Sequence, residues 1–317
     1  MSYTGPGFDP PQPRRSRRGP LTVALVALVP GALLGWAVYA AVGGSGGDEG
    51  TGSAAAPTSP SASASASTSS RTSSPAPSAS SEDEKPSASA AAGGPLRGKV
   101  VVIDPGHNPE NFKHTAEINR QVDIGTNRKE CDTTGTSTDD GYAEADFTLD
   151  VAHRMRALLE KQGATVKLTQ DGDRPFGPCV DERARIGNRA KADAVVSIHA
   201  DGSGTGNRGF HVILPGAVRA GAADTRAIVE PSGDLGTRIA GNFVRVTGSA
   251  PSNYVGGGTG LVTRKDLGGL NLSTVPKVFI ECGNMRDSKD AALLTSGAWR
   301  QKAAQGISDG IVSFLRG

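Results

Sequence analysis

The chain has 317 residues, which is enough for one large domain or two modest ones. Glycine is abundant, with 43 residues, while only 4% of the residues are aromatic. The net charge of +2 gives no overall case for nucleic-acid binding, and we expect a monomer with no nucleic-acid partner.

The chain begins with a basic cluster that is followed by an apolar run. Four arginines at positions 14–18 precede residues 20–42, which contain no charged side chain. This run has about the ~20 residues that a membrane helix needs. We therefore predict a basic cytoplasmic segment at 1–19 and a single-pass transmembrane anchor at 20–42, with the rest of the chain outside. The alternative is a signal peptide cleaved near "AVYAAVGG", which would give a secreted protein.

A low-complexity segment follows the apolar run. Residues 43–94 are mostly Ser, Ala, Pro, Thr and Gly, with one small charged patch, "EDEK". Such a composition cannot bury enough apolar surface to offset the entropy that ordering would cost. We predict a disordered linker at 43–94 and a folded domain at 95–317.

Strand and helix patterns alternate through the folded domain. Predicted strands cover 100–103, 165–169, 195–198, 209–215 and 278–280, and predicted helices cover 144–162, 180–192, 234–246 and 297–315. A long polar segment, 107–142, is predicted as a loop. The alternation predicts an α/β domain with a mainly parallel twisted sheet and helices on both faces. Parallel strands covered on both faces read as continuous apolar runs, as several of these do.

Three of the buried strand patterns end in a titratable side chain. His107, His199 and Glu281 come just past the apolar runs "VVVI", "VVSI" and "VFI". Ligands of such folds bind at the carboxyl ends of the strands. We therefore expect these three side chains to meet at one edge of the sheet.

Glu144 is a third candidate metal ligand, because it begins a predicted helix three residues before Phe147 and so shares its apolar side. Two histidines and one carboxylate are typical of a catalytic zinc site with an open fourth position. We predict one zinc ion on His107, Glu144 and His199, with Glu281 beside it as the proton carrier. The simpler interpretation is a set of hydrogen-bonded loop histidines and an ordinary first-turn glutamate.

The other histidines are weaker candidates. His114 lies in a polar loop and His153 lies off the apolar stripe of its helix, so we predict that both are solvated. His211 interrupts a predicted strand, and we name it together with Arg264 as a candidate substrate contact.

The cysteines divide into two environments. Cys131 and Cys179 lie in Gly-, Thr- and Pro-rich surroundings, whereas Cys282 follows an apolar strand. A location outside the cell permits a disulfide. We predict a Cys131–Cys179 disulfide and a reduced, buried Cys282. No two cysteines are close in sequence, which argues against a cysteine metal site.

The motifs "VVIDPGHN", "VVSIHAD" and "VFIECGN", with the helix that begins at Glu144, resemble those of the zinc-dependent N-acetylmuramoyl-L-alanine amidases of the amidase-3 family. The resemblance covers 98–315 and is strongest to the actinobacterial cell-wall branch. It implies zinc on the three residues named above, a catalytic role for Glu281, and the Cys131–Cys179 disulfide. Many members carry Gly-Gly after the first histidine, where this chain has Asn-Pro.

The resemblance also implies a reaction and its partners. The family hydrolyses the amide that joins the lactyl group of N-acetylmuramic acid to L-alanine of the peptidoglycan stem. The partners would be peptidoglycan or muropeptides and, through the N-terminal helix, the membrane.

Two other classes of protein are alternatives. A non-catalytic wall-binding module would have no need of Glu281. A zinc carboxypeptidase acting on the stem peptide would need an arginine clamp for a terminal carboxylate. Arg183, Arg185 and Arg264 are the candidates for such a clamp.

Overall fold

The structure is a computed structural model, and it describes residues 93–317. The predicted cytoplasmic segment, the predicted anchor at 20–42 and all of the predicted linker except its last two residues lie outside the described residues. No helix within 93–317 combines the length and the apolar character that a membrane crossing requires.

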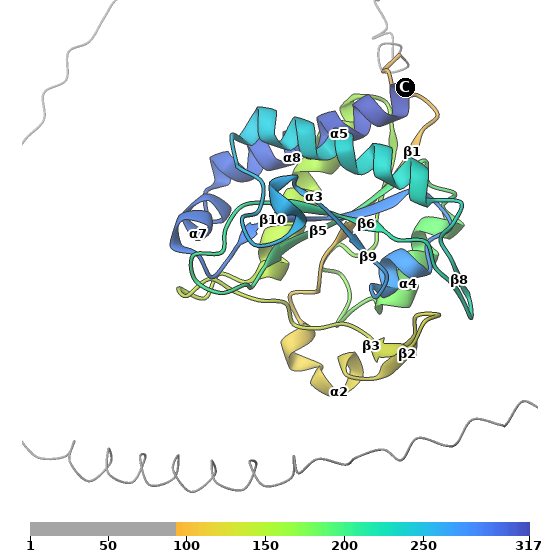
Figure 1. The fold of residues 1–317 in the computed structure, drawn as a ribbon, viewed down its shortest axis with the longest axis horizontal. Helices are drawn as coiled ribbons and strands as arrows, with labels where there is room; N and C mark the ends of the chain where they lie inside the picture. Colours follow the sequence, from red (N-terminus) through yellow and green to blue (C-terminus); the bar gives the residue numbers. More distant parts are fainter. Residues whose placement is uncertain (1–92) are drawn as a thin grey trace, which may run out of the picture. The chain divides into compact units, whose positions relative to one another are not determined.

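One six-stranded sheet forms the centre of the domain (Figure 1), with the strand order β4-β1-β5-β10-β6-β9. Its strands are β1 (Val100–Pro105), β4 (Thr165–Leu168), β5 (Ala194–Asp201), β6 (His211–Pro215), β9 (Leu261–Arg264) and β10 (Lys277–Asn284). Strands β4, β1, β5 and β10 run parallel, which agrees with the predicted mainly parallel sheet. Strand β6 pairs antiparallel with β10, and β9 pairs parallel with β6. No helix lies between β5 and β6. A parallel crossover usually needs a helix, so the short connection agrees with the antiparallel direction of β6.

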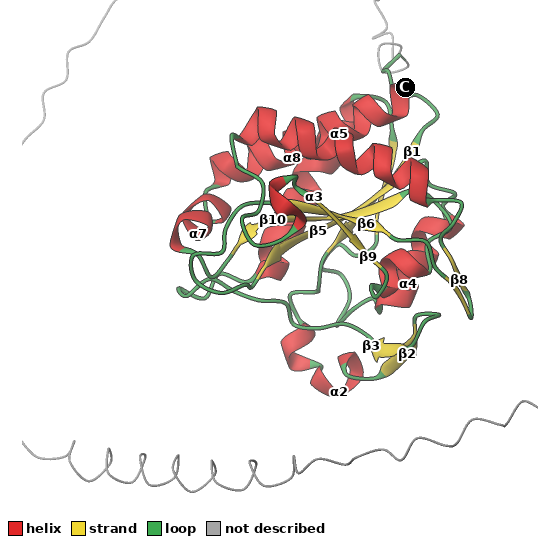
Figure 2. Cartoon of the chain, in the orientation of Figure 1, coloured by secondary structure: helices red, strands yellow, loops and turns green. Residues whose placement is uncertain are grey.

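Helices cover both faces of the sheet (Figures 1 and 2). One face carries α3 (Glu144–Lys161), α5 (Val229–Thr247) and α8 (Gly297–Arg316), and the other carries α4 (Val180–Arg189) and α6 (Gly268–Asn271). Strand alternation builds the two cores, since Val101 and Ile103 join the larger cluster while Val102 joins the smaller one beside α4. In α3 the buried apolar face includes Phe147, Val151, Met155 and Leu159, while Leu158 lies only partly buried.

Helix α5 begins at Val229, earlier than the predicted position 234. Pro231 lies in its first turn, where a missing N–H costs nothing because the first helical N–H groups have no partner within the helix.

The segment at 107–142, predicted as a loop, contains several short elements. They are η1 (Asn111–Lys113), α2 (Thr115–Ile118), β2 (Gln121–Asp123) and β3 (Arg128–Glu130), and β2 and β3 form a hairpin. Each is too short to show an apolar period. Elsewhere the chain forms the short β7 (Arg219–Ala220), β8 (Ala223–Asp224), η2 (Gly256–Gly258) and α7 (Ser288–Leu294).

A disulfide joins this segment to α4. Cys131 and Cys179 are bonded, as predicted, and Cys282 is free and buried. The two bonded cysteines form a small apolar cluster with Val122 and Ile124, which gives the hairpin its own core.

Helices α5 and α8 approach closely because α8 carries a glycine at the contact. A methyl group on Gly310 would lie 2.5 Å from the Cα atom of Ile239. Since the obstacle is backbone, a rotamer change cannot relieve it.

We predict that Gly310→Ala lowers the free energy of unfolding by about 1–3 kcal/mol, because the two helices must separate. Gly241→Ala is the matched control, since Gly241 is exposed on α5 and has free space around its Cα. That change should stabilise the protein by about 0.5–1 kcal/mol. Urea denaturation of both variants checks this, and an unchanged stability of Gly310→Ala would contradict the packing described.

Candidate metal centre

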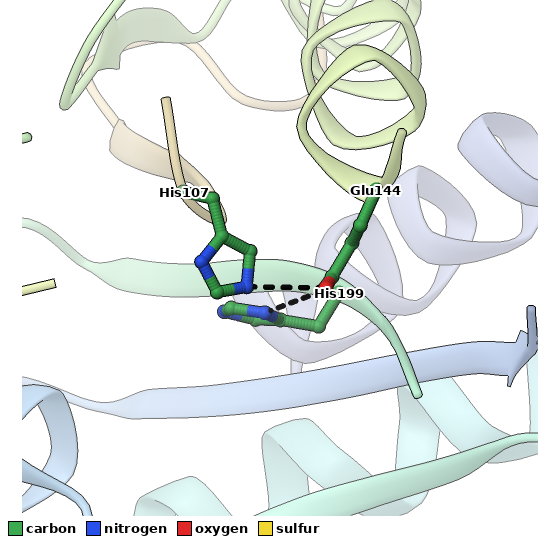
Figure 3. A group of neighbouring side chains, drawn as sticks. All are labelled: His107, Glu144 and His199. Atoms are coloured by element: carbon green, nitrogen blue, oxygen red, sulfur yellow. Dashed lines mark hydrogen bonds and ion pairs between the residues drawn. The ribbon is translucent and has the colours of Figure 1, made fainter. Parts of the chain in front are cut away.

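His107, Glu144 and His199 converge at the carboxyl edge of the sheet (Figure 3). His107 lies just past β1, His199 lies near the end of β5, and Glu144 is the first residue of α3. The Nε2 atom of His107 lies 3.2 Å from Oε2 of Glu144, and Nδ1 of His199 lies 2.9 Å from Oε1. One ligand atom from each residue lies within 4.8 Å of the others. Two imidazole nitrogens and one carboxylate in such a group are the kind of donors that zinc sites use.

Glycines leave the space that the two rings fill. A methyl group on Gly106 would collide with the ring of His199. A methyl group on Gly135 would lie 2.8 Å from Cδ2 of His107 and 2.9 Å from Oε2 of Glu144. The cradle around the three side chains therefore excludes any larger residue at these two positions.

The backbone of His107 is held in an unfavourable conformation. Its φ is +62°, in the left-handed region that costs free energy for a residue with a side chain. The carbonyl oxygen of His107 accepts hydrogen bonds from Nε2 of Gln170, at 3.1 Å, and from a guanidinium nitrogen of Arg183, at 2.9 Å. These two bonds fix the direction in which the imidazole leaves the chain.

The second nitrogen of each imidazole also has a partner. The Nδ1 atom of His107 lies 3.1 Å from the carbonyl oxygen of Thr133 and 3.5 Å from Oδ1 of Asp132. The Nε2 atom of His199 lies 3.3 Å from Oγ of Ser197. An N–H directed at these oxygens leaves the opposite nitrogen of each ring free to bind a metal.

The carboxylates around His107 set its charge. Burial lowers the pKa of His107, but Glu144 and Asp132 outweigh that effect and raise the pKa well above its usual value. Binding of a metal ion at this ring therefore competes with protonation of the ring.

Asp104 is the centre of a buried cluster of charges beneath the two histidines. It is fully buried, and it pairs with Nζ of Lys277 at 2.9 Å and with Arg183 at 2.8 Å. Burial raises the pKa of Asp104, but the two cations outweigh it and hold the pKa far below the usual range. Arg183 also pairs with Asp132, whose pKa it lowers to about 2 against the effect of burial.

Glu281 faces the same cleft from β10. It pairs in register with His199 on one side and with His211 on the other. Its Oε2 atom is buried and has no hydrogen-bond partner among the described residues. Burial is the main reason that the pKa of Glu281 is raised well above its usual value, and the charges of Glu144 and Asp201 add to it. A buried carboxyl group in a cleft, with a pKa shifted by its surroundings, is a candidate for proton transfer.

The cleft has a volume of about 310 Å³, and the three converging side chains, Glu281 and Arg264 line it. Arg264 also pairs with Asp266 at 2.6 Å. His211 is only 5% exposed, lies beside Glu281 on the neighbouring strand β6 and packs edge-on against Tyr254. Contact of Arg264 or His211 with a substrate stays a prediction. Arg264 is the better placed of the two, because it lines the cleft.

The predicted strand ends differ in one respect from the structure. Strands β5 and β10 continue to Asp201 and Asn284, so His199 and Glu281 lie within strands rather than after them. The polar residues hid this continuation.

His114 and His153, predicted to be solvated, are part-exposed and pair with Glu117 and Asp171.

Sequence reasoning missed the side chains that support the site. Arg183 was a candidate carboxylate clamp, but it is buried and its guanidinium is taken up by Asp104, Asp132 and backbone carbonyls. The ring of Phe279 stacks on that of His199, with centroids 5.2 Å apart. A signal was available in Lys277, a charge placed directly before the apolar run of a buried strand.

The relatives found by comparison with known proteins are named as amidases. The family model described as N-acetylmuramoyl-L-alanine amidase (Amidase_3) matches residues 101–313. N-acetylmuramoyl-L-alanine amidase Rv3717 of Mycobacterium tuberculosis is 40% identical over 221 residues, which is 69% of this chain and 88% of that protein. The probable cell wall amidase LytH of Staphylococcus aureus is 29% identical, over 70% of this chain and 60% of its own length. The crystal structure of the amidase Ami1 from Mycobacterium smegmatis superposes with a TM-score of 0.63 at 41% identity, covering 69% of this chain and 98% of that one.

We predict that Asp104→Asn lowers the free energy of unfolding by about 3–5 kcal/mol at pH 7, because Lys277 would stay buried without its carboxylate and Arg183 would keep only Asp132. Since folding lowers the pKa of Asp104, its ion pairs contribute their full stabilisation above about pH 4, the ordinary pKa of an unfolded aspartate, and this contribution declines as the pH falls from there toward the lower folded-state pKa. The difference in the free energy of unfolding between wild type and variant should therefore shrink in acid.

Urea denaturation at neutral and acidic pH measures this difference. Asp234→Asn is the control, because Asp234 forms an exposed pair with Arg238 that is worth at most about 1 kcal/mol. Equal losses from the two variants would show that the Asp104 cluster does not stabilise the fold.

Proposed function

The chain belongs to the N-acetylmuramoyl-L-alanine amidase family Amidase_3, and from this premise we propose that it hydrolyses the amide between N-acetylmuramic acid and L-alanine of the peptidoglycan stem. The observation that carries the proposal is the convergence of His107, Glu144 and His199 in the cleft that Glu281 also lines. Two imidazoles and a carboxylate beside a second carboxyl group provide both a metal site and a proton carrier.

We assign the metal site to zinc. Nε2 of His107, Nδ1 of His199 and the carboxylate of Glu144 would hold the ion, and the glycine cradle leaves those atoms free of other bulk. When bound, zinc supplies Lewis acidity, which polarises a carbonyl group and makes water more acidic.

Glu281 carries the proton. Its Oε2 atom has no hydrogen-bond partner among the described residues, and Glu281 lines the cleft in which we propose that the substrate binds. The carboxylate takes a proton from the attacking water and gives it to the nitrogen of L-alanine as the C–N bond breaks, because an amine leaves only once it is protonated. Its place within β10 holds the group rigidly at the cleft.

The arrangement of arginines weighs against a carboxypeptidase. Such an enzyme needs a guanidinium that is free to bind a terminal carboxylate. Arg183 is buried in its own ion pairs, and Arg185 pairs with Asp181 on α4. Arg264 alone of the three candidates lines the cleft, and it is paired with Asp266.

The proposed place of action is outside the cytoplasm. LytH, a relative, is named a probable cell wall amidase. We propose that the segment at 20–42 anchors the protein and that 43–94 is the linker to the domain at 95–317. Cleavage after 20–42 would release the domain as a secreted enzyme.

We predict that the purified protein holds about one zinc ion per chain, and that His107→Ala or His199→Ala loses most of it because two ligands leave an incomplete site. His153→Ala is the matched control, since this histidine is on α3 and pairs with Asp171 at the surface. Metal analysis after gel filtration gives the answer. Full zinc content in either ligand variant would refute the assignment.

We predict that Glu281→Gln folds normally, keeps near-normal zinc and loses at least about 10²-fold in the rate of amide hydrolysis, because the amide cannot carry the proton. Glu160→Gln, at an exposed position of α3, should leave the rate unchanged. Rates on muropeptides and zinc content are measured for both. Loss of zinc from Glu281→Gln would make Glu281 a ligand, and an unchanged rate would remove it from the mechanism.

A further inference from the structure

The two histidines of the proposed zinc site present different nitrogens to it. His107 points Nε2 toward Glu144, while His199 points Nδ1 toward the same carboxylate. Each ring must therefore be oriented by contacts at its other nitrogen. These contacts pass through different residues for the two rings, and we call each chain of contacts a route.

The first route runs from His107 to Asp132. The Nδ1 atom of His107 lies 3.1 Å from the carbonyl oxygen of Thr133 and 3.5 Å from Oδ1 of Asp132. The backbone N–H of Thr133 donates to the same Oδ1 atom at 2.8 Å. Asp132 thus contacts the ring and also holds Thr133, the residue whose carbonyl oxygen the ring contacts.

The second route runs from His199 to Asp104. The Nε2 atom of His199 lies 3.3 Å from Oγ of Ser197, and that hydroxyl donates to Oδ2 of Asp104 at 2.9 Å. The serine oxygen is therefore free to accept the N–H of the ring, which fixes the tautomer that leaves Nδ1 unprotonated.

Both routes end on one guanidinium group. One terminal nitrogen of Arg183 donates to Oδ1 of Asp104 at 2.8 Å, and the other donates to Oδ2 of Asp132 at 2.9 Å. The second nitrogen also donates to the carbonyl oxygen of His107 at 2.9 Å. Arg183 is only 4% exposed, so water does not compete for these bonds.

The surroundings hold Arg183 in place. Its Nε atom donates to the carbonyl oxygen of Pro178 at 2.8 Å. Cys179 caps α4 one turn before Arg183 and is bonded to Cys131, the residue before Asp132. The disulfide therefore ties the backbone that carries Asp132 to the helix that carries Arg183.

We propose that Arg183 is a positioning residue that orients both imidazole ligands at once, by bridging the two carboxylates on which their outer nitrogens depend. The inference rests on the proposed zinc site. Lysine cannot replace arginine here, because an ammonium group is a single point of charge and lacks the planar fork that reaches two carboxylates.

The test is the zinc affinity of the full chain carrying Arg183→Lys, measured by competition with a chelator. Partners behind a metal ligand typically contribute 10–100-fold to affinity, so we expect a loss of about that size. Arg185→Lys is the matched control, since Arg185 is two residues along α4, is exposed and pairs with Asp181. It should bind zinc as the wild type does.

Two further measurements separate positioning from mere support of the fold. Visible absorption of the Co²⁺-loaded protein reports the geometry of the ligands, and melting of the metal-free protein reports fold stability. We expect Arg183→Lys to change the cobalt spectrum while the metal-free protein remains folded at the temperature of the titration. A wild-type affinity with a wild-type spectrum would overturn the inference, as would an affinity loss fully accounted for by unfolded protein.

A second set of variants leaves Arg183 in place, in case its replacement does not fold. Asp132→Asn interrupts the first route and Ser197→Ala the second, and each should weaken zinc binding by about 10-fold. If Arg183 couples the routes, the double variant should lose clearly less than the product of the single losses. Independent, multiplicative losses would overturn the coupling.

The wild-type titration distinguishes this inference from the proposed function. A wild-type chain that binds no zinc would refute the proposed metal site and the inference together. Normal zinc binding in the wild type with independent routes would refute the inference alone.

Discussion

The carboxylate of Asp104 is the point on which the arrangement of the domain depends. It is fully buried at the end of β1, and it receives hydrogen bonds from β5, from α4, from the start of β10 and from Thr169 after β4. Removing a carboxylate from water costs several kcal/mol, and only good pairing offsets this. Its partners Arg183 and Lys277 are buried with it. None of these groups can be satisfied unless the three central strands and α4 are in register, so the cluster specifies one arrangement of the carboxyl edge.

That arrangement is what the candidate metal centre requires. Strands β5 and β10 bring His199 and Glu281 side by side in register. Glu144, the first residue of α3, contacts the ring of His199. His107 occupies a costly backbone conformation that hydrogen bonds to its carbonyl group maintain. The chemistry proposed for the cleft thus uses side chains whose orientation is set by buried polar contacts rather than by mobile loops.

The sequence predicted what depends on local pattern and could not predict what depends on distant pairing. Apolar runs that end in His107, His199 and Glu281 were sufficient to predict the sheet and the edge where these residues meet. The bonds from Arg183 to Asp132 and Asp104 join residues 51 and 79 positions apart, and no local period records them. The β2–β3 hairpin was missed because its strands are three residues long and depend on a disulfide for their core.

The identity of the bond that is cut tests the central claim most directly. Intact peptidoglycan would be digested with the zinc-loaded protein, and the new ends would be identified by mass spectrometry. The account predicts stem peptides with a free L-alanine amine, and glycan strands whose lactyl groups end in a free carboxylate. Stem peptides shortened from their carboxyl ends, with the lactyl amide intact, would contradict it.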